Sequence, residues 1–213
     1  MNYRKFIVES GLRMLNSGLT VETWGNISAR DPETGLIYLT PSGMSYPAIT
    51  EDDVVVMNSQ FERVSGDRKP TVEYAMHISI MNHRPEINAV VHTHPIYSQV
   101  FAVLHEDIPQ IIDEAAQFLG GPCRCAGYAL PGSLDLADNV VQALGTDAMS
   151  CLMANHGAVC VGETMDEAFK VCKVLEMTAQ IYQMARSIGT PKMIAEENIR
   201  SMRHFIKYEY GQK

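Results

Sequence analysis

The pair His92 and His94 follows the apolar run Ala89-Val90-Val91 and precedes Pro95. Side chains alternate between the two faces of a strand, so both imidazoles would project from the same face of a strand end. Proline donates no hydrogen bond and would stop the pairing there. Two neutral imidazoles this close suit one divalent transition metal. The alternative is an ordinary hydrogen-bonded histidine pair at a strand end.

Further ligands must come from elsewhere in the chain, because two imidazoles alone do not make a tight metal site. The best candidates are Glu73 in Pro70-Thr71-Val72-Glu73 and His156 in Asn155-His156-Gly157. Three imidazoles and a carboxylate complete a site for which Zn²⁺ is the first choice, with Mn²⁺, Co²⁺ and Fe²⁺ as alternatives. A structural metal would need nothing more, but a carboxylate beside a metal can also carry protons.

Glu73 stands where the sequence predicts the start of a helix. Thr71 can act as the N-cap of a helical pattern that stops near Pro85, which puts Glu73 in the first turn. The helix dipole favours a carboxylate there, and the free amides could also hold an anion. The alternative is that Glu73 only caps the helix at the surface. We expect His77 and His83, on the same helix, to be structural.

His156 follows the apolar segment 150–154, which predicts a buried strand. Gly157 would allow a sharp turn after it and remove bulk beside the imidazole. The end of a buried strand is where a third ligand could meet the first two.

Two segments combine glycine with small hydrogen-bonding residues: Gly25-Asn26 and Thr40-Pro41-Ser42-Gly43. Glycine lets a backbone amide approach a ligand closely, and Asn, Thr and Ser side chains add donors. The combination suits a phosphate or another oxyanion. The alternative is that both segments are plain turns, and only their convergence on a metal would distinguish the two.

The composition is that of an ordinary globular chain, and we expect one domain spanning residues 1–213. The net charge of -8 argues against a general affinity for nucleic acid or an anionic membrane. The amino terminus has no pattern of a secretory signal, and five cysteines are an odd number, which fits reduced thiols in the cytoplasm.

Hydrophobic periodicity and turn residues predict alternating helices and short strands. Helices are expected over 3–17, from Thr71 to near Pro85, and over 96–104, 133–144, 164–187 and 196–210. Strands are expected within 23–30, 36–43, 53–57, 89–94, 124–128 and 150–154, and the segment 108–114 is expected as a short strand running into a loop. These elements would have to bring the candidate ligands together.

Five short motifs occur in the order and spacing of the class II aldolase family, which is typified by L-fuculose-1-phosphate aldolase and includes L-ribulose-5-phosphate 4-epimerase. They are Thr23-Trp24-Gly25-Asn26, Thr40-Pro41-Ser42-Gly43-Met44, Pro70-Thr71-Val72-Glu73, His92-Thr93-His94-Pro95 and Asn155-His156-Gly157. The resemblance covers nearly the whole chain. It implies an α/β/α three-layer fold around a mostly antiparallel sheet, and a homotetramer with active sites at the subunit interfaces.

The resemblance also implies roles for individual residues. His92, His94 and His156 would bind the metal, and Glu73 would ligate it at rest and act as acid and base once substrate displaces it. The substrate phosphate would lie among residues of the glycine-containing segments and the segment before Glu73, namely Gly25, Asn26, Thr40, Ser42, Gly43 and Thr71. The implied reaction is reversible cleavage of a small ketose 1-phosphate, through a metal-bound enediolate, to dihydroxyacetone phosphate and an aldehyde.

The chain departs from the aldolase pattern in two places. The aldolase pattern has paired serines before the glutamate, whereas this chain has Thr71-Val72, so one hydroxyl contact to phosphate is missing. The aldolase tyrosine that handles the aldehyde oxygen from a neighbouring subunit has no evident match, and Ile112-Asp113-Glu114 stands there. Asp113 or Glu114 would replace that tyrosine, with Tyr208 or Tyr210 standing in for a second one. A 5-deoxypentulose 1-phosphate is therefore as plausible a substrate as L-fuculose 1-phosphate.

Three other functions stay open at this point. A pentulose-phosphate 4-epimerase would resemble the same pattern but carries Asp where this chain has Glu73. A 5-methylthioribulose-1-phosphate dehydratase would use the same metal to assist loss of water. An adducin-like binding module would share the fold but lack the metal histidines.

Overall fold

The computed structural model describes residues 1–211. The helices are α1 (Tyr3–Asn16), α2 (Tyr74–His83), α3 (Ile96–Leu104), α4 (Asp113–Phe118), α5 (Leu134–Leu144), α6 (Met165–Ile188) and α7 (Glu196–Tyr208). The strands are β1 (Asn26–Arg30), β2 (Ile37–Leu39), β3 (Val55–Met57), β4 (Arg63–Ser65), β5 (Ala89–Thr93), β6 (Arg124–Ala126), β7 (Ser150–Met153) and β8 (Gly157–Gly162).

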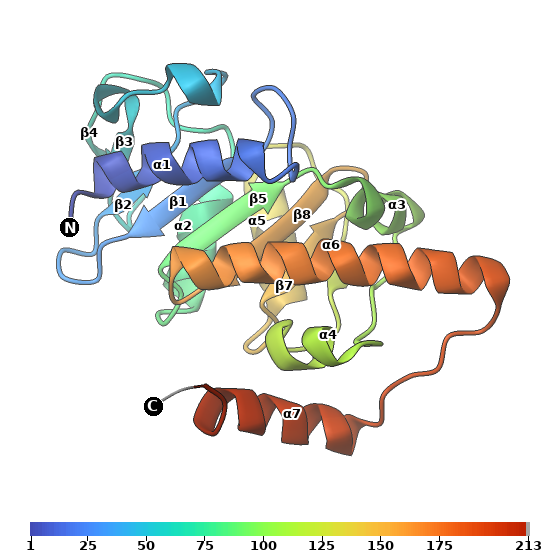
Figure 1. The fold of residues 1–213 in the computed structure, drawn as a ribbon. Helices are drawn as coiled ribbons and strands as arrows, with labels where there is room; N and C mark the ends of the chain where they lie inside the picture. The colour runs from blue at the N-terminus through green and yellow to red at the C-terminus, as the bar shows by residue number, and fades with distance from the viewer. Residues whose placement is uncertain (212–213) are drawn as a thin grey trace.

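The strands form one eight-stranded sheet in the order β4-β3-β2-β1-β5-β8-β7-β6. Every neighbouring pair is antiparallel except β6 and β7, which are parallel. Helices α1 and α6 cover one face of the sheet, and α2 and α5 cover the other (Figure 1). The α/β three-layer fold with a mostly antiparallel sheet is therefore confirmed.

Alternation along β5 shows why both faces of the sheet are covered. Ala89 and Val91 belong to the core under α1 and α6, whereas Val90 belongs to the core under α2 and α5. A strand that is apolar on both faces needs a layer on each side, which is why it reads as a continuous apolar run. By the same alternation His92 lies on the Val90 face, toward α2.

The strand register places the functional segments side by side. Asn26, the first residue of β1, pairs with His92 near the end of β5. On the other side of β5, His92 pairs with Val159 of β8, two residues after Gly157, with which β8 begins. One end of the central strands therefore collects residues from three distant parts of the sequence.

Several expected elements differ in detail from the observed ones. The segment 108–114 contributes only an isolated bridge from Ile108 to Cys123, and Asp113 and Glu114 begin α4 where a loop was expected. Strands β4 and β8 were not predicted; β8 is apolar and buried throughout, so it shows no alternation. Ser133 and Thr164, which begin two of the expected helices, cap α5 and α6 with their side chains. No helix within residues 1–211 is long and apolar enough to span a membrane.

Candidate active site and metal centre

His92 and His94 approach each other at the end of β5, as their spacing predicts. Their Nε2 atoms lie 3.0 Å apart, and the ring centroids lie 4.7 Å apart. His92 is buried, and its Nδ1 faces the backbone oxygen of Ala158 at 3.0 Å. A proton on Nδ1 satisfies that bond and leaves Nε2 free as a metal ligand.

His156 lies in the three-residue turn that joins β7 to β8. The residue of this turn with left-handed backbone is Asn155, with φ of 55°, so the expectation that Gly157 provides a sharp turn was wrong. The side chain of Asn155 accepts a hydrogen bond from His105 at 2.7 Å. Asparagine tolerates this conformation better than most residues, which explains its place before His156.

Gly157 is required for close packing rather than for its backbone angle. A Cβ added there would lie 2.5 Å from the backbone oxygen of Thr93, 3.2 Å from His92 Cε1 and 3.3 Å from His94 Cδ2. The absence of a side chain therefore lets the β7–β8 turn approach the histidine pair.

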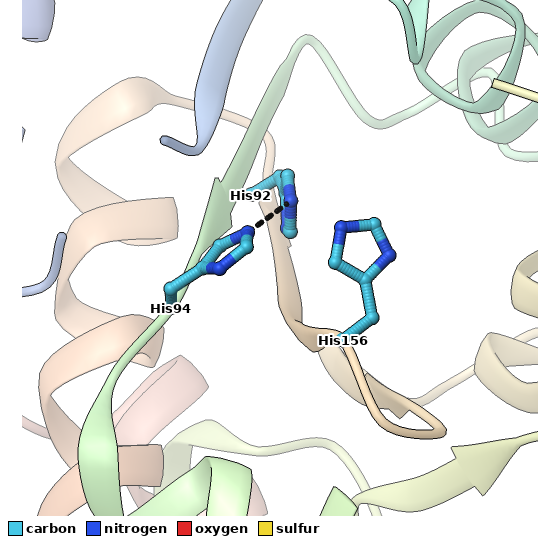
Figure 2. Close-up of side chains that lie close together, drawn as sticks. All are labelled: His92, His94 and His156. Atoms are coloured by element: carbon cyan, nitrogen blue, oxygen red, sulfur yellow. Dashed lines mark hydrogen bonds between the residues drawn. The ribbon is translucent and has the colours of Figure 1, made fainter. Parts of the chain in front are cut away.

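The three imidazoles form one cluster. One nitrogen from each of His92, His94 and His156 can be chosen so that all lie within 4.8 Å of one another. Figure 2 shows the three rings from the end of β5 and the β7–β8 turn pointing toward one another. Burial and the neighbouring histidine His92 lower the pKa of His94 to about 3 and that of His156 to about 4. Both are therefore neutral near pH 7, which is the form that binds metal.

Glu73 completes the cluster from the start of α2. Its Oε2 lies 3.3 Å from His92 Nε2, and its Oε1 lies 3.2 Å from His156 Nε2. Burial raises the pKa of Glu73, but His92, the hydrogen bond from Asn26 and His156 outweigh it, and the pKa is lowered overall. The carboxylate is therefore ionised near neutral pH.

The start of α2 differs from the sequence expectation. The helix begins at Tyr74, so Glu73 occupies the N-cap position instead of the first turn, and Thr71 lies in the preceding turn. Thr71 Oγ1 accepts a hydrogen bond from the Glu73 amide at 3.4 Å. Although Glu73 occupies the N-cap position, its side chain makes no capping hydrogen bond and is buried. The alternative that Glu73 only caps the helix at the surface is therefore wrong.

One atom of the cluster tests whether a cation fits. Glu73 Oε1 is among the buried side-chain atoms of the described residues that have no hydrogen-bond partner, although it lies 3.2 Å from His156 Nε2. Buried polar atoms are normally satisfied, so an unpaired carboxylate oxygen facing the histidine cluster needs an explanation. Three neutral imidazoles and a carboxylate are a suitable donor set for a divalent transition metal. The residues therefore fit a divalent metal ion.

The glycine-containing segments lie next to this cluster. Gly25 has φ of 72°, and a Cβ there would lie 2.5 Å from the backbone oxygen of His92. Asn26 is buried and donates from Nδ2 to Glu73 Oε2 at 2.8 Å. The first of the two segments thus contacts both the histidine strand and the carboxylate.

The second segment pairs with the chain that leads to Glu73. Pro41 forms a bridge with Pro70, and the Thr71 amide donates to the backbone oxygen of Thr40 at 3.0 Å. The Thr40 hydroxyl accepts a hydrogen bond from the Ile27 amide at 3.2 Å. Thr40 and Thr71 are buried. The last two residues of the segment, Ser42 and Gly43, are exposed.

The four residues expected on the aldehyde side lie elsewhere within this chain. Asp113 and Glu114 form the exposed first turn of α4, and Tyr208 and Tyr210 are exposed at the end of α7. Helices α4 and α7 pack against each other, and both lie far from the end of β5 that leads into α3 (Figure 1). A single chain therefore does not bring these four residues to the histidines.

Three contacts near the cluster were not predicted from the sequence. The Trp24 ring stacks on His94, with centroids 6.1 Å apart and planes 21° apart. Gln99 of α3 donates from Nε2 to the backbone oxygen of His156 at 2.9 Å. His77 contacts Asn26 from the second turn of α2. Trp24 belongs to one of the five sequence motifs, but no local sequence pattern indicates the contacts of Gln99 and His77.

Comparison with known proteins agrees with this arrangement. The family described as Class II Aldolase and Adducin N-terminal domain matches residues 5–183. A 5-deoxy-D-ribulose 1-phosphate aldolase of Bacillus thuringiensis serovar kurstaki is 38% identical, over 99% of this chain and 97% of that protein. A 5-methylthioribulose-1-phosphate/5-deoxyribulose-1-phosphate aldolase of Rhodospirillum rubrum is 32% identical, over 96% of this chain and 91% of that protein.

A solved structure named L-fuculose 1-phosphate aldolase has the same fold. It superposes with a TM-score of 0.93 at 32% identity, covering 97% of this chain and 96% of that one. The family match, the relatives and this structure all describe aldolases. The chain therefore belongs to the class II aldolase family and is an aldolase enzyme similar to L-fuculose-1-phosphate aldolase.

Proposed function

We propose that this enzyme reversibly cleaves a small ketose 1-phosphate, of the 5-deoxypentulose 1-phosphate or L-fuculose 1-phosphate kind, to dihydroxyacetone phosphate and an aldehyde. The names of the two curated relatives favour a 5-deoxypentulose 1-phosphate, and the name of the solved structure favours L-fuculose 1-phosphate. Both substrates carry the same phosphorylated end, so one phosphate and metal site would serve for either.

The observation that supports the proposal best is the position of the Glu73 carboxylate. Its carboxylate bridges two histidines of a three-histidine cluster, is buried, and keeps Oε1 without a hydrogen-bond partner. A carboxylate that only held structure would have its oxygens satisfied by donors. An unsatisfied, ionised carboxylate beside a metal site is suited to accept and return a proton.

A divalent cation held by His92, His94 and His156 would stabilise negative charge that develops on the substrate oxygens. We propose Zn²⁺ as the first choice, with Mn²⁺, Co²⁺ and Fe²⁺ as alternatives. Glu73 would be a further ligand at rest.

Proton transfer would use the Glu73 carboxylate. In the cleavage direction the ionised Glu73 carboxylate would take up the proton that the C4 hydroxyl loses as C4 becomes the aldehyde carbonyl, and the electron pair of the C3–C4 bond stays with C3. Protonated Glu73 then gives its proton to C3, which completes dihydroxyacetone phosphate. In the condensation direction ionised Glu73 takes the same proton from carbon, in agreement with its lowered pKa.

We propose that the phosphate lies between the two glycine-containing segments and the turn before α2. The residues of this site would be Gly25, Asn26, Thr40, Ser42, Gly43 and Thr71. Support comes from the backbone pairing of Thr40 with Thr71 and from the second, unused hydrogen on the amide nitrogen of Asn26. Backbone amides near glycines with positive φ are suited to hold an oxyanion.

We further propose a cytoplasmic homotetramer whose active sites lie at the subunit interfaces. Asp113, Glu114, Tyr208 and Tyr210 would then act on the aldehyde side of a neighbouring subunit's site. Support comes from Figure 1, in which α4 and α7 lie apart from the end of β5 that leads into α3, so a contribution from these residues would have to come from a neighbouring subunit.

Incubation with candidate ketose 1-phosphates tests the proposal. Dihydroxyacetone phosphate would be detected by NADH-dependent reduction to glycerol 3-phosphate. Release with one of the ketose 1-phosphates is the expected result, because neither an epimerase nor a dehydratase forms this compound as a net product. Metal analysis of the purified protein separates the remaining alternative, because an adducin-like binding module would contain no stoichiometric metal. A protein that holds metal but converts the substrate only to an epimer or a dehydrated product would refute the proposed cleavage.

A further inference from the structure

A chain of buried hydrogen bonds connects the sheet to Glu73. Ser28 Oγ lies 2.7 Å from His77 Nδ1, and His77 Nε2 lies 2.5 Å from Asn26 Oδ1. Asn26 Nδ2 then donates to Glu73 Oε2 at 2.8 Å. All four side chains are buried, and Ser28 and His77 have no exposed surface. The Glu73 carboxylate therefore contacts this chain of hydrogen bonds as well as the histidine cluster.

The spacing of these residues follows from two regular elements lying against each other. Asn26 and Ser28 are two apart on β1, so they project from the same face, about 7 Å apart along the strand. Glu73 and His77 are four apart, on one side of α2, and about 6 Å apart along the helix axis. Because these two distances are nearly equal, Asn26 can contact Glu73 while Ser28 contacts His77.

The chemistry of the groups fixes the direction of every bond. Glu73 is ionised and can only accept, so the Asn26 amide must present its nitrogen to it. Asn26 Oδ1 can only accept, so the proton of His77 must be on Nε2. Nδ1 of the neutral ring then accepts from the hydroxyl of Ser28. Burial lowers the pKa of His77 to about 3, which agrees with a neutral ring.

We propose that His77, held in one tautomer by Ser28, is a positioning residue that orients the Asn26 amide and through it the Glu73 carboxylate for proton transfer. The inference rests on the proposed acid and base role of Glu73. Without the His77 proton, the Asn26 oxygen loses its donor, and the bond to Glu73 alone then holds the amide in this orientation. A rotated amide would turn its oxygen toward the carboxylate and repel it.

Kinetics of substituted enzymes test the proposal. His77→Leu removes the donor and should lower kcat about 100-fold with the metal content unchanged, because the cluster histidines are intact. His77→Gln keeps a nitrogen donor within reach of Asn26 and should recover at least about 10-fold of that loss. Thr178→Val is the matched control, because Thr178 is equally buried and its hydroxyl bonds only within α6.

A double substitution separates positioning from general support of the fold. If His77 acts through Asn26, His77→Leu should lower kcat by less than about 3-fold in the Asn26→Ala background. If His77→Leu lowers kcat by the same factor in the wild-type and the Asn26→Ala backgrounds, the proposal is overturned. An unchanged kcat in His77→Leu would also overturn it.

The tautomer of His77 gives a readout that does not depend on turnover. Nitrogen NMR of the metal-free protein with labelled histidine should show His77 protonated on Nε2 and not on Nδ1. Ser28→Ala should retain this protein's metal content but reduce that preference. The opposite tautomer would refute the inference whatever the activity. If the wild-type enzyme releases no dihydroxyacetone phosphate, the proposed function has failed, and the tautomer measurement still decides the arrangement.

Discussion

Glu73 and Asn26 stand 47 residues apart in the chain, and a buried hydrogen bond of 2.8 Å joins the Glu73 Oε2 to the Asn26 Nδ2. The other carboxylate oxygen, Oε1, lies 3.2 Å from His156 Nε2. Both oxygens thus lie near a cluster histidine, but only Oε2 is held by a hydrogen bond, because Oε1 has no hydrogen-bond partner. This difference between the two oxygens makes the role of Glu73 testable.

Glu73→Gln should keep the fold and most of the bound metal yet lower kcat about 10²–10⁴-fold. Glutamine has the same shape but cannot accept and return a proton at the operating pH. Turnover and metal content should be measured on the same preparation. Glu33→Gln, at an exposed position, is the control and should have wild-type activity. Full activity in Glu73→Gln would remove its assigned role.

Removal of the metal should abolish activity reversibly. A chelator should inactivate the wild-type enzyme. Added Zn²⁺ should restore the activity when about one ion is bound per chain. His94→Ala should neither hold stoichiometric metal nor regain activity, because one of the three imidazoles is missing. His83→Ala, at an exposed position on α2, is the control. Wild-type metal content in His94→Ala would show that the cluster is not the binding site.

Gly157→Ala should weaken metal binding although no ligand is changed. The new Cβ would lie 2.5 Å from the Thr93 backbone oxygen, which cannot move freely. We expect a loss of about 1–3 kcal/mol in the free energy of unfolding and about 10–100-fold in metal affinity. Chemical denaturation and metal titration measure the two effects. Gly189→Ala is the matched control, because no atom lies within 4 Å of a Cβ there.

Acid should destabilise the metal-free protein in part through His77. Its pKa is lowered by burial to about 3 in the folded state, from an ordinary value of 6.5. The unfolded chain binds this proton below pH 6.5, and the folded chain binds it only near pH 3. The stabilisation is therefore complete above pH 6.5 and declines by about 1.4 kcal/mol per pH unit toward pH 3.

Urea unfolding at about pH 7.5 and pH 5.0 measures this effect. Between these values His77→Gln should lose about 2 kcal/mol less stability than the wild type, because glutamine does not titrate. His83→Gln, at an exposed position, should lose as much as the wild type. Equal losses in wild type and His77→Gln would mean that the folded state protonates His77 readily.

Val72→Ser should tighten substrate binding. The aldolase pattern has a second serine at this position, and Val72 is 60% exposed, so the change removes little packing. A new hydrogen bond to a phosphate is worth roughly 1.5–3 kcal/mol, which corresponds to about a 10–100-fold decrease in KM. Val64→Ser, at a position 52% exposed on β4, is the control. An unchanged KM would place the phosphate away from this turn.

Much of the architecture was determined by local sequence pattern. The alternation along β5 predicted that His92 and His94 share a face, and helical periodicity beginning at Ser133 and Thr164 placed two helix starts where the structure has side-chain caps. Such features depend on neighbours within a few residues, so a sequence shows them directly. The five motifs added the family and the candidate ligands.

The tertiary structure alone decided which distant residues meet. Packing of α2 across β1 places His77 on Asn26, 51 residues away, and the close approach at Gly157 joins the β7–β8 turn to β5. Burial on both faces of the sheet sets this packing, and no local pattern records which helix covers which strand. The sequence by itself therefore determined the ligand types and their faces, whereas the long-range packing determined their distances and the support behind Glu73.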